Sequence, residues 1–373
     1  MATEIKSDQR ISRLAPLTEV LAHMESHVKP VAPESCEIAA ARGSTLSEDV
    51  FVQQQLPARA IALRDGFAVD AEATRDASSY TPATLPVPAF LNAGEALPPG
   101  TNAILPPDTL TIRGTHAEIT SSLTSGDGVL SKGADANPAI PLLQSGQILR
   151  DSAIAASSAA GISTVRVRAP RIALLRQRRE NDDILDAALA WTCRAVAAAG
   201  GVALLDSGKD IESATRSQTA DAIIAIGGTG AGHQDDAVLS LVRAGNVAFH
   251  GIAIAPGETA ALGFAAEKPV LLIPGRLDAA FSCWLLLGTK MLALLSKRPL
   301  DEQGRICRLK RKVASSLGLT EMIPVSCNGE EAEPLASHYL PLQTLARADG
   351  WISVPAQSEG YPAGASVIVR SLP

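Results

Sequence analysis

A glycine-rich stretch followed by two acids is the part of the sequence best suited to chemistry. It reads DAIIAIGGTGAGHQDD and spans residues 221–236. The apolar run 222–226 is typical of a buried parallel strand, and the glycines after it let a ligand approach bare backbone. An apolar pattern resumes at Ala237 and predicts a helix whose N-terminus attracts an anion. The stretch therefore predicts a site for a phosphorylated ligand, with the acids Asp235 and Asp236 beside it.

Alternating strands and helices must position this site. Strands are predicted at 171–175, 202–205, 222–226 and 269–273, and helices at 182–199, 211–217, 234–244 and 277–295. Such alternation predicts a parallel α/β sheet with right-handed crossovers. Ligands bind these sheets at the carboxyl ends of the strands. We therefore expect three loops to face one crevice: 176–183, 227–236 and 274–278.

The flanking segments have a different pattern. Residues 17–28 predict an amphipathic helix, and 152–162 predict a helix that leads into a strand at 164–167. Between 81 and 140, short apolar runs broken by proline and glycine predict a small β domain. Residues 297–312 are charged and predict a linker, after which 313–373 predict an all-β terminal domain.

Composition limits the classes of function. A chain of 373 residues exceeds one ordinary core, so two to four domains are expected. The net charge of −6 argues against a nucleic-acid-binding surface. The five cysteines form no CxxC or Cys/His cluster, so zinc is not expected, and their odd number without an export signal predicts a cytoplasmic protein. The apolar stretch 271–295 carries Arg276, Asp278 and Lys290, which predicts that it does not span a membrane.

Seven short segments, taken in order, give a resemblance to a known family. The chain resembles the molybdopterin molybdenumtransferases, the family that includes the E domain of gephyrin. The segments are RDGFAV at 64–69, AGEALPPG at 93–100, GAD at 133–135, GGTGAGHQD at 227–235, APG at 255–257, PG at 274–275 and LARADG at 345–350. A single short glycine motif recurs by chance, but seven in the family's order indicate the fold.

The resemblance implies a fold class and a division into domains. The class is α/β plus β, in an elongated multidomain subunit that forms a homodimer. The implied parts are an N-terminal linking and dimerisation domain at 8–53 and 138–168, an inserted small β domain at 54–137, a three-layer α/β molybdopterin-binding domain at 169–298 and a C-terminal β-barrel-like domain at 303–373.

The resemblance also implies an activity. It is molybdenum cofactor biosynthesis, in which molybdate is inserted into adenylylated molybdopterin with Mg²⁺ and AMP is released. The active site would lie between the α/β domain of one subunit and the β domain of the other. Mg²⁺ prefers oxygen ligands and phosphate partners. The family's functional acids match Asp65, Asp135, Glu180 and Asp235.

The roles carried over from the family are as follows. Asp65, Asp235 and Glu180 would be catalytic, and Asp65, Asp135 and Asp235 would hold the metal. Glu180 falls in RIALLRQRREN, where the family has VALFSTGDEL. The pterin and its phosphates would contact Gly227, Gly228, Thr229, Gly230, Gly232, Pro274, Gly275 and Arg276.

The sequence departs from the family where an anion should bind. The lysines of the family's KPGKP become Ala255 and Glu258, and the lysine just upstream becomes Gly251. A carboxylate repels an anion there, most strongly in a low-dielectric cleft. Polar residues are also replaced, at Ala93, Arg276, Ala279, Gln343 and Thr344. Arginines at 176, 178, 179 and 276 could hold phosphate or molybdate bidentately, or they could be surface charges.

Three functions therefore stay open. The first is the enzyme with a remodelled anion site. The second is a catalytically impaired carrier of molybdopterin or finished cofactor, or a partner of a molybdoenzyme or of the upstream molybdopterin adenylyltransferase. The third is a scaffolding dimer without a pterin site. Each acid also has a structural alternative: Asp235 and Asp236 could be helix-dipole partners, Asp65 a turn residue, and Asp135 an ordinary loop acid.

Overall fold

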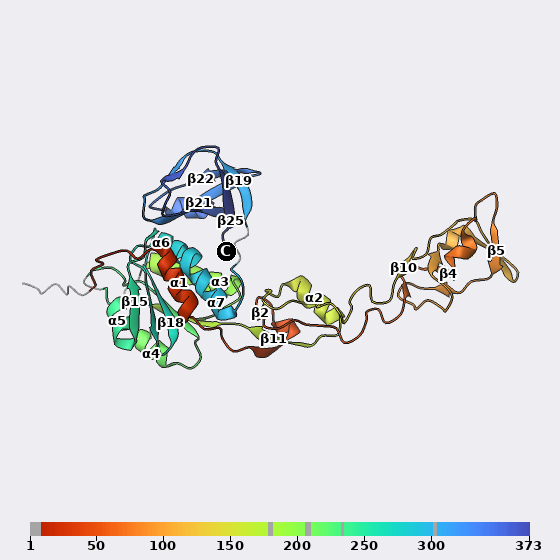
Figure 1. The fold of residues 1–373 in the computed structure, drawn as a ribbon, viewed down its shortest axis with the longest axis horizontal. Helices are drawn as coiled ribbons and strands as arrows, with labels where there is room; N and C mark the ends of the chain where they lie inside the picture. Colours follow the sequence, from red (N-terminus) through yellow and green to blue (C-terminus); the bar gives the residue numbers. More distant parts are fainter. Residues whose placement is uncertain (1–8, 178–181, 206–209, 233–234, 301–303) are drawn as a thin grey trace, which may run out of the picture.

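The computed structural model describes residues 9–177, 182–205, 210–232, 235–300 and 304–373. The molecule is elongated (Figure 1). An α/β region and the C-terminal β region lie together at one end, and a slender middle segment leads to a small β region at the other. The predicted fold class, α/β plus β in an elongated multidomain chain, is confirmed.

The central sheet of the α/β region has six strands in the order β13-β12-β14-β18-β17-β15. Four are parallel: β12 (Arg171–Arg176), β13 (Val202–Leu205), β14 (Ala222–Ile226) and β18 (Lys268–Ile273). The four strands predicted to be parallel are parallel, and two further strands that the sequence analysis did not predict, β17 (Ala261–Ala265) and β15 (Asn246–His250), extend the sheet in the antiparallel direction. A parallel crossover needs a dozen or more residues, whereas β17 and β18 are joined by only Ala266 and Glu267, both with positive φ.

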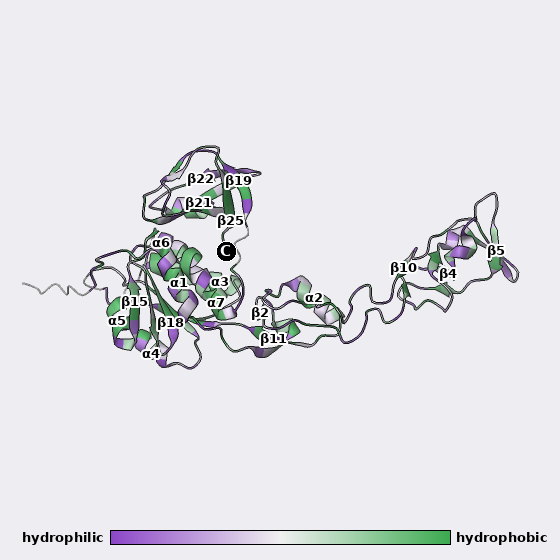
Figure 2. Ribbon diagram, viewed as in Figure 1, coloured by the Kyte–Doolittle hydropathy of each residue, from purple (hydrophilic) through white to green (hydrophobic). Residues whose placement is uncertain are grey.

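Helices cover both faces of this sheet and make three layers. On one face Ile224 and Ile226 pack with α3 (Asp183–Ala198) and with α6 (Leu277–Cys283), which continues through a π-helical turn (Trp284–Gly288, η4) into α7 (Thr289–Ser296). On the other face Ile223 and Ala225 pack with α4 (Ile211–Arg216) and α5 (Ala237–Ala244). Burial on both faces explains the continuous apolar run of β14, and the strands of this sheet are largely green in Figure 2.

One helical stretch, Leu277–Ser296, is long and apolar enough to cross a membrane by length and composition alone. In the structure 78% of its apolar window is buried inside the protein. It contributes Trp284 and Leu292 to the core against the central sheet. This is the environment of a core helix, as the charges within the stretch predict.

The N-terminal helix and the middle segment are separate in space. Helix α1 (Leu17–His27) buries Val20 and Met24 in the core of the α/β region. The middle segment has a three-stranded antiparallel sheet of β1 (Glu34–Glu37), β11 (Thr164–Arg168) and β2 (Thr45–Leu46), with α2 (Asp151–Ala159) beside it. A short 3-10 turn at Ile38–Ala40 (η1) follows β1 in this segment, whereas the one at Pro107–Thr109 (η3) lies in the small β region, between β7 and β8.

The small β region at the far end contains short antiparallel strands. One sheet has β6 (Phe90–Leu91), β4 (Gly66–Val69) and β7 (Ala103–Leu105), and a second has β5 (Ala83–Pro86), β9 (His116–Ile119) and β8 (Leu110–Arg113). A third pairing joins β10 (Val129–Leu130) to β3 (Ile61–Ala62). These strands fall where the sequence predicts a small β domain, while the domain boundaries stay a prediction.

The C-terminal strands close into a barrel. They are β19 (Arg305–Leu309), β21 (Thr320–Asn328), β22 (Glu331–Pro334), β23 (Gly350–Val354) and β25 (Ser366–Ser371). The ring closes because β21 pairs with both β22 and β23. A small sheet of β20 (Val313–Ala314) with β24 (Gly360–Tyr361), and the short helix α8 (Leu342–Arg347), complete the region. The linker prediction for 297–312 is wrong in part, since β19 lies there with Cys307 and Leu309 buried between charged residues.

One strand of the barrel sheet belongs to the α/β region. Strand β16 (Ile254–Ala255) pairs in parallel with β21, with Ile254 opposite Thr320 and Ala255 opposite Glu321. The amide of Thr320 also donates to Ala253 O at 2.9 Å. The two regions therefore share hydrogen-bonded backbone directly before the Pro256-Gly257-Glu258 segment.

Candidate functional site

The loops after β12, β14 and β18 begin side by side. The strands are neighbours, and Arg176, Ile226 and Ile273 lie opposite one another at their carboxyl ends. The amide of Gln177 donates to Ile226 O at 3.0 Å, and that of Gly227 to Ile273 O at 2.8 Å. The predicted meeting of three loops at one edge of the sheet is thus present at the start of each loop. Glu180, Arg178, Arg179 and His233 lie outside the described residues.

The glycine loop has the backbone that only glycine adopts easily. Gly227 and Gly228 have φ angles of 98° and 69°. A Cβ on Gly228 would lie 3.3 Å from that of Ala237, whose amide donates to Gly228 O at 3.1 Å. A Cβ on Gly275 would lie 3.4 Å from Gly227 Cα. Backbone conformation therefore favours glycine at 227 and 228, and at 228 close packing against α5 favours it as well, in addition to any need of a ligand.

Thr229 faces the protein interior. It is 2% exposed, and its Oγ1 lies 2.9 Å from Oγ1 of Thr259. Its carbonyl accepts a hydrogen bond from His250 Nε2 at 3.1 Å. Thr259 and His250 thus hold the loop in place, and sequence reasoning missed both because 30 and 21 residues separate them from Thr229 without a local motif.

Asp235 folds back onto its own loop. Its Oδ2 accepts from the Gly232 amide at 3.0 Å, and its amide donates to Gly232 O at 3.0 Å. A Cβ on Gly230 or Gly232 would lie 2.7 or 3.0 Å from this Oδ2. The two glycines therefore make room for the carboxylate. Asp236 occupies the N-cap position of α5, where its side chain makes no capping hydrogen bond.

The three acids predicted to hold a metal do not meet within one chain. Asp65 lies between β3 and β4 and accepts from the Ala93 amide at 2.8 Å. Asp135 follows β10, and its amide donates to Leu56 O at 2.9 Å. Both follow strands of the small β region at the far end of the molecule, whereas Asp235 follows β14 of the α/β region at the other end (Figure 1). Among the described residues no group of three or more His, Cys, Asp or Glu could hold a metal ion.

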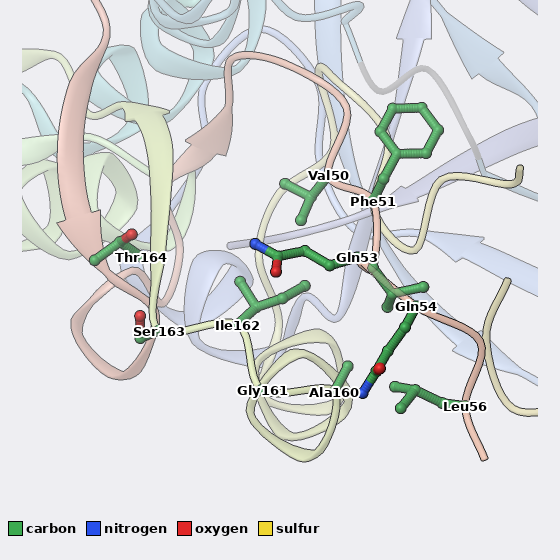
Figure 3. A pocket seen from close by; sticks show the side chains of 11 residues that line it. Val50, Phe51, Gln53, Gln54, Leu56, Ala160, Gly161, Ile162, Ser163 and Thr164 are labelled. Atoms are coloured by element: carbon green, nitrogen blue, oxygen red, sulfur yellow. The ribbon is translucent and has the colours of Figure 1, made fainter. Parts of the chain in front are cut away.

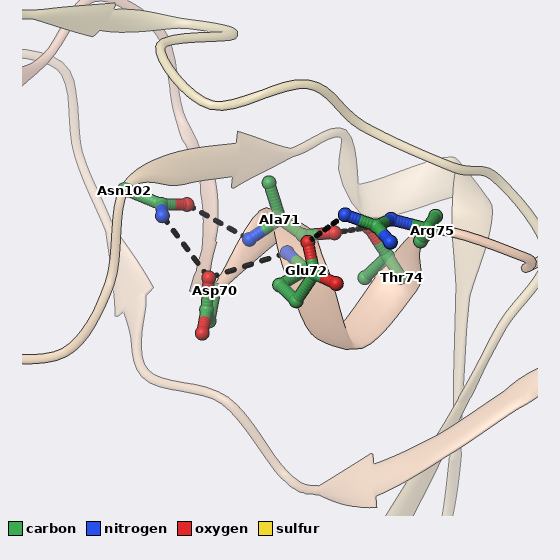
Figure 4. Close-up of polar contacts among 6 residues, drawn as sticks. All are labelled: Asp70, Ala71, Glu72, Thr74, Arg75 and Asn102. Atoms are coloured by element: carbon green, nitrogen blue, oxygen red, sulfur yellow. Dashed lines mark hydrogen bonds and ion pairs between the residues drawn. The ribbon is translucent and has the colours of Figure 1, made fainter.

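A neighbouring acid in the far β region has a structural task. Asp70 follows β4 and begins the 3-10 turn η2 (Ala71–Thr74) by accepting from the Glu72 amide at 3.2 Å (Figure 4). Asn102 donates to Asp70 Oδ1 at 3.0 Å and accepts from the Ala71 amide at 2.8 Å. These bonds brace the end of the strand that starts with the Asp65 turn.

Glu258 stands where the family's lysine is expected. Its Oε2 accepts from the Gly257 amide at 3.1 Å. The pKa of the fully buried Cys283 thiol is raised, chiefly by burial and further by the negative charges of Glu258 and Asp278. A Cβ on Gly257 would lie 2.8 Å from Cys283 Sγ. The loop that should offer a cation therefore presents a carboxylate close to the core.

The described arginines of the site are paired with acids. Arg176, 15% exposed, donates from Nε to Asp186 Oδ1 at 2.7 Å. Arg276 donates from Nε and Nη2 to the two oxygens of Asp278, both at 3.1 Å, and its guanidinium lies 4.7 Å from the Tyr339 ring centre. The hydrogen bond to Asp278 raises the pKa of Arg276. An incoming anion would have to compete with these carboxylates.

A cavity of about 630 Å³ lies elsewhere, in the middle segment. It is lined by residues 50–54 and 56 of an extended stretch and by 160–164 after α2 (Figure 3). Gln53 and Gln54 contribute its polar wall beside Ile162. None of the predicted site residues lines this cavity, so it is distinct from the glycine loop.

Comparison with known proteins gives a family for each part of the chain. Residues 15–161 match the MoeA N-terminal region (domain I and II), 173–293 match a probable molybdopterin binding domain, and 307–372 match the MoeA C-terminal region (domain IV). Molybdopterin molybdenumtransferase 2 of Mycobacterium tuberculosis is 25% identical over an alignment 405 positions long, which covers 95% of this chain and 98% of that protein. A putative molybdopterin biosynthesis protein of Methanocaldococcus jannaschii is 30% identical over 154 residues, covering 41% of this chain and 36% of that relative.

Solved structures agree in fold. A molybdopterin biosynthesis moeA protein from Pyrococcus horikoshii OT3 superposes with a TM-score of 0.77 at 21% identity, covering 96% of this chain and all of that one. A second structure of a P. horikoshii moeA protein gives a TM-score of 0.73 at 26% identity, over 96% of this chain and 98% of that one. Since the three family regions follow one another from residue 15 to residue 372, the chain belongs to the MoeA family of molybdopterin molybdenumtransferases.

Proposed function

We propose that this protein inserts molybdate into adenylylated molybdopterin with Mg²⁺ and releases AMP. Membership in the MoeA family assigns the chain to molybdenum cofactor biosynthesis. The observation that carries the finer proposal is the meeting of the loops that begin at Gln177, Gly227 and Pro274 at the carboxyl edge of the sheet. Bare glycine backbone and the N-terminus of α5 at that edge suit a phosphorylated pterin.

The proposal requires a second copy of the chain. Asp65 and Asp135 lie far along the molecule from Asp235, so the described residues of a single chain do not provide a fitting Mg²⁺ site (Figure 1). We therefore assign no step to Mg²⁺ within a single subunit. A homodimer in which the far β region of one copy approaches the α/β edge of the other would supply additional oxygen ligands.

The residues of this chain would act mainly by position. The bare backbone of Gly227 and Gly228, both with positive φ, would let the pterin approach the sheet edge, and Thr229 holds the loop through Thr259 and His250. Asp235, fixed on the Gly232 amide, places a negative oxygen next to the loop. Arg276 would reach a phosphate only by giving up part of its pairing with Asp278.

A second function, a carrier of molybdopterin or finished cofactor, is favoured by the charges at the crevice. Glu258 replaces a lysine, and both Arg176 and Arg276 are paired with carboxylates. These features would weaken molybdate binding more than pterin binding, because molybdate is held through its charge and its oxygen atoms, whereas the pterin also offers a ring system to the site. In this role the cytoplasmic dimer would deliver the cofactor to a molybdoenzyme, or receive molybdopterin from its adenylyltransferase.

One assay separates the two functions. The full chain is mixed with adenylylated molybdopterin, Mg²⁺ and molybdate, and AMP is followed over a range of protein concentrations. The enzyme is supported by AMP release that needs both Mg²⁺ and molybdate and falls when dilution dissociates the dimer. Tight pterin binding without AMP release supports the carrier, and the absence of pterin binding contradicts both.

A further inference from the structure

A buried carboxylate lies at the junction between the α/β region and the barrel. Glu321 of β21 has a side chain only 1% exposed, and its Oε1 accepts a hydrogen bond from the His338 amide. Its Oε2 is buried and has no hydrogen-bond partner among the residues that the structure describes. In the sheet Glu321 lies opposite Ala255, directly before Pro256, Gly257 and Glu258. A glutamate side chain is rarely fully buried unless it is paired or hydrogen-bonded, and here the His338 amide is the bonded group.

The partner of Glu321 has an unusual backbone. His338 has a φ of 60°, a left-handed conformation that is uncommon for a residue with a side chain. Its ring Nδ1 also lies 3.4 Å from Glu321 Oε1. Local strain of this kind persists where the surroundings hold it, and here the bond from the His338 amide to Glu321 does so.

The next two residues contact the other crevice loop. The Tyr339 ring lies under the Arg276 guanidinium at 4.7 Å, and the Leu340 amide donates to Asp278 Oδ2 at 3.4 Å. Leu340 is buried in the same core as Trp284 and Met322. We call residues 338–340 the strap. One end of the strap is fixed by Glu321, and the other end rests on the loop that carries Pro274 and Gly275.

We propose that Glu321 is a positioning residue that sets the 255–258 loop and the 274–278 loop relative to each other through the strap. Strand β16 ties the first loop to β21, while Tyr339 and Leu340 tie the second loop to the barrel. The barrel thereby determines the spacing of two loops of the crevice. That these two loops bind a ligand rests on the proposed function, whereas their spacing does not.

Hydrogen–deuterium exchange of the free full-length protein tests this positioning. In Glu321→Ala, peptides covering 252–260 and 274–280 are expected to exchange about tenfold faster, while peptides of β12 and β14 keep their rates. Glu321→Gln retains an acceptor for the His338 amide and is expected to restore most of the protection. Glu330→Ala, at an exposed turn of the same barrel, is the control and should leave all rates unchanged.

Two results would overturn the proposal. One is unchanged exchange at 252–260 in folded Glu321→Ala, and the other is equally faster exchange across the whole barrel, which would show a merely stabilising role. If Glu321→Ala does not fold, Tyr339→Ala carries the test, because its side chain is exposed. Tyr339→Ala should speed up exchange in the 274–280 peptide alone. An unchanged exchange rate in that peptide would show that the strap does not hold the 274–278 loop. Since the assay needs no ligand, failure of pterin binding would count against the proposed function only.

Discussion

The glycine loop (227–232) differs from the two loops that face it (255–258 and 274–278) in its internal contacts and in its charges. The glycine loop is tied together by its own groups, with Asp235 on the Gly232 amide and Thr229 between Thr259 and His250. The facing loops carry Glu258 and an Arg276 that is occupied by Asp278. We therefore propose that the backbone of the glycine loop suits a pterin, while the facing loops offer little of the positive charge that molybdate would need.

The largest expected effect is on the glycine-loop side, at Asp235. We predict that Asp235→Ala lowers Mg²⁺-dependent AMP release about a hundredfold and molybdopterin affinity by much less, because general acid–base or metal-side groups contribute at about this scale. Asp235→Asn keeps an acceptor for the Gly232 amide and separates the charge from the loop geometry. Turnover and pterin affinity would be measured together. Equal losses of both would mean that Asp235 only shapes the loop.

The next effect tests the facing side. We predict that Glu258→Lys tightens molybdate binding by about tenfold, since it exchanges repulsion for attraction in a partly buried loop and each tenfold corresponds to about 1.4 kcal/mol. The measurement is a molybdate titration by calorimetry, with the exposed Glu330→Lys as a matched charge control. An identical titration curve in both variants would show that residue 258 does not face the anion.

The pH dependence of stability tests the burial of Cys283, the α6 thiol against which Gly257 of the facing loop packs. The raised pKa of Cys283 means that the folded protein keeps the thiol protonated after the unfolded chain, at about pH 9, begins to lose the proton. Stability should therefore decrease above that pH, by at most about 1.4 kcal/mol per pH unit from this group. Unfolding by urea between pH 8 and pH 10 should show a shallower decrease in Cys283→Ala than in the wild type. Parallel curves would contradict the burial of this thiol.

The smallest effect concerns Arg276. Because its guanidinium is bound by Asp278 and Tyr339, we predict that Arg276→Ala changes molybdate affinity less than twofold and costs about 0.5–1 kcal/mol of stability, the size of an exposed cation–π contact or ion pair. Chemical unfolding and the same titration measure both quantities. A large loss of molybdate affinity would restore Arg276 as an anion ligand and weaken the contrast between the two sides.

The fold could be predicted where burial leaves a clear pattern. β14 is buried on both faces and shows as an unbroken apolar run, and α1 shows its helical period. β17 was missed because the turn that joins it to β18, Ala266-Glu267, lacks the usual Asn-Gly or Asp-Gly signal, and its antiparallel neighbour β15 was missed with it. β19 was missed because charged residues alternate with Cys307 and Leu309.

The site was predictable only in its local parts. The meeting of the glycine loop with its neighbouring loops follows from the parallel direction of their strands, which the alternation of strands and helices predicts, while the order of the strands came from the structure. The contacts of Thr229, and the distance between Asp65 and Asp235, depend on tertiary structure that no local motif records. The pairing of Arg276 with Asp278 could have been suspected, because an acid two residues away competes with any external anion.

The pairing of β16 with the barrel strand β21 has a consequence for how the protein unfolds. Its hydrogen bonds cross from residues 254–255 to residues 320–321, so the barrel sheet is complete only while the α/β region is folded. Heating should therefore melt these two regions in a single cooperative transition. The far β region, joined through the slender middle segment, is free to melt at its own temperature.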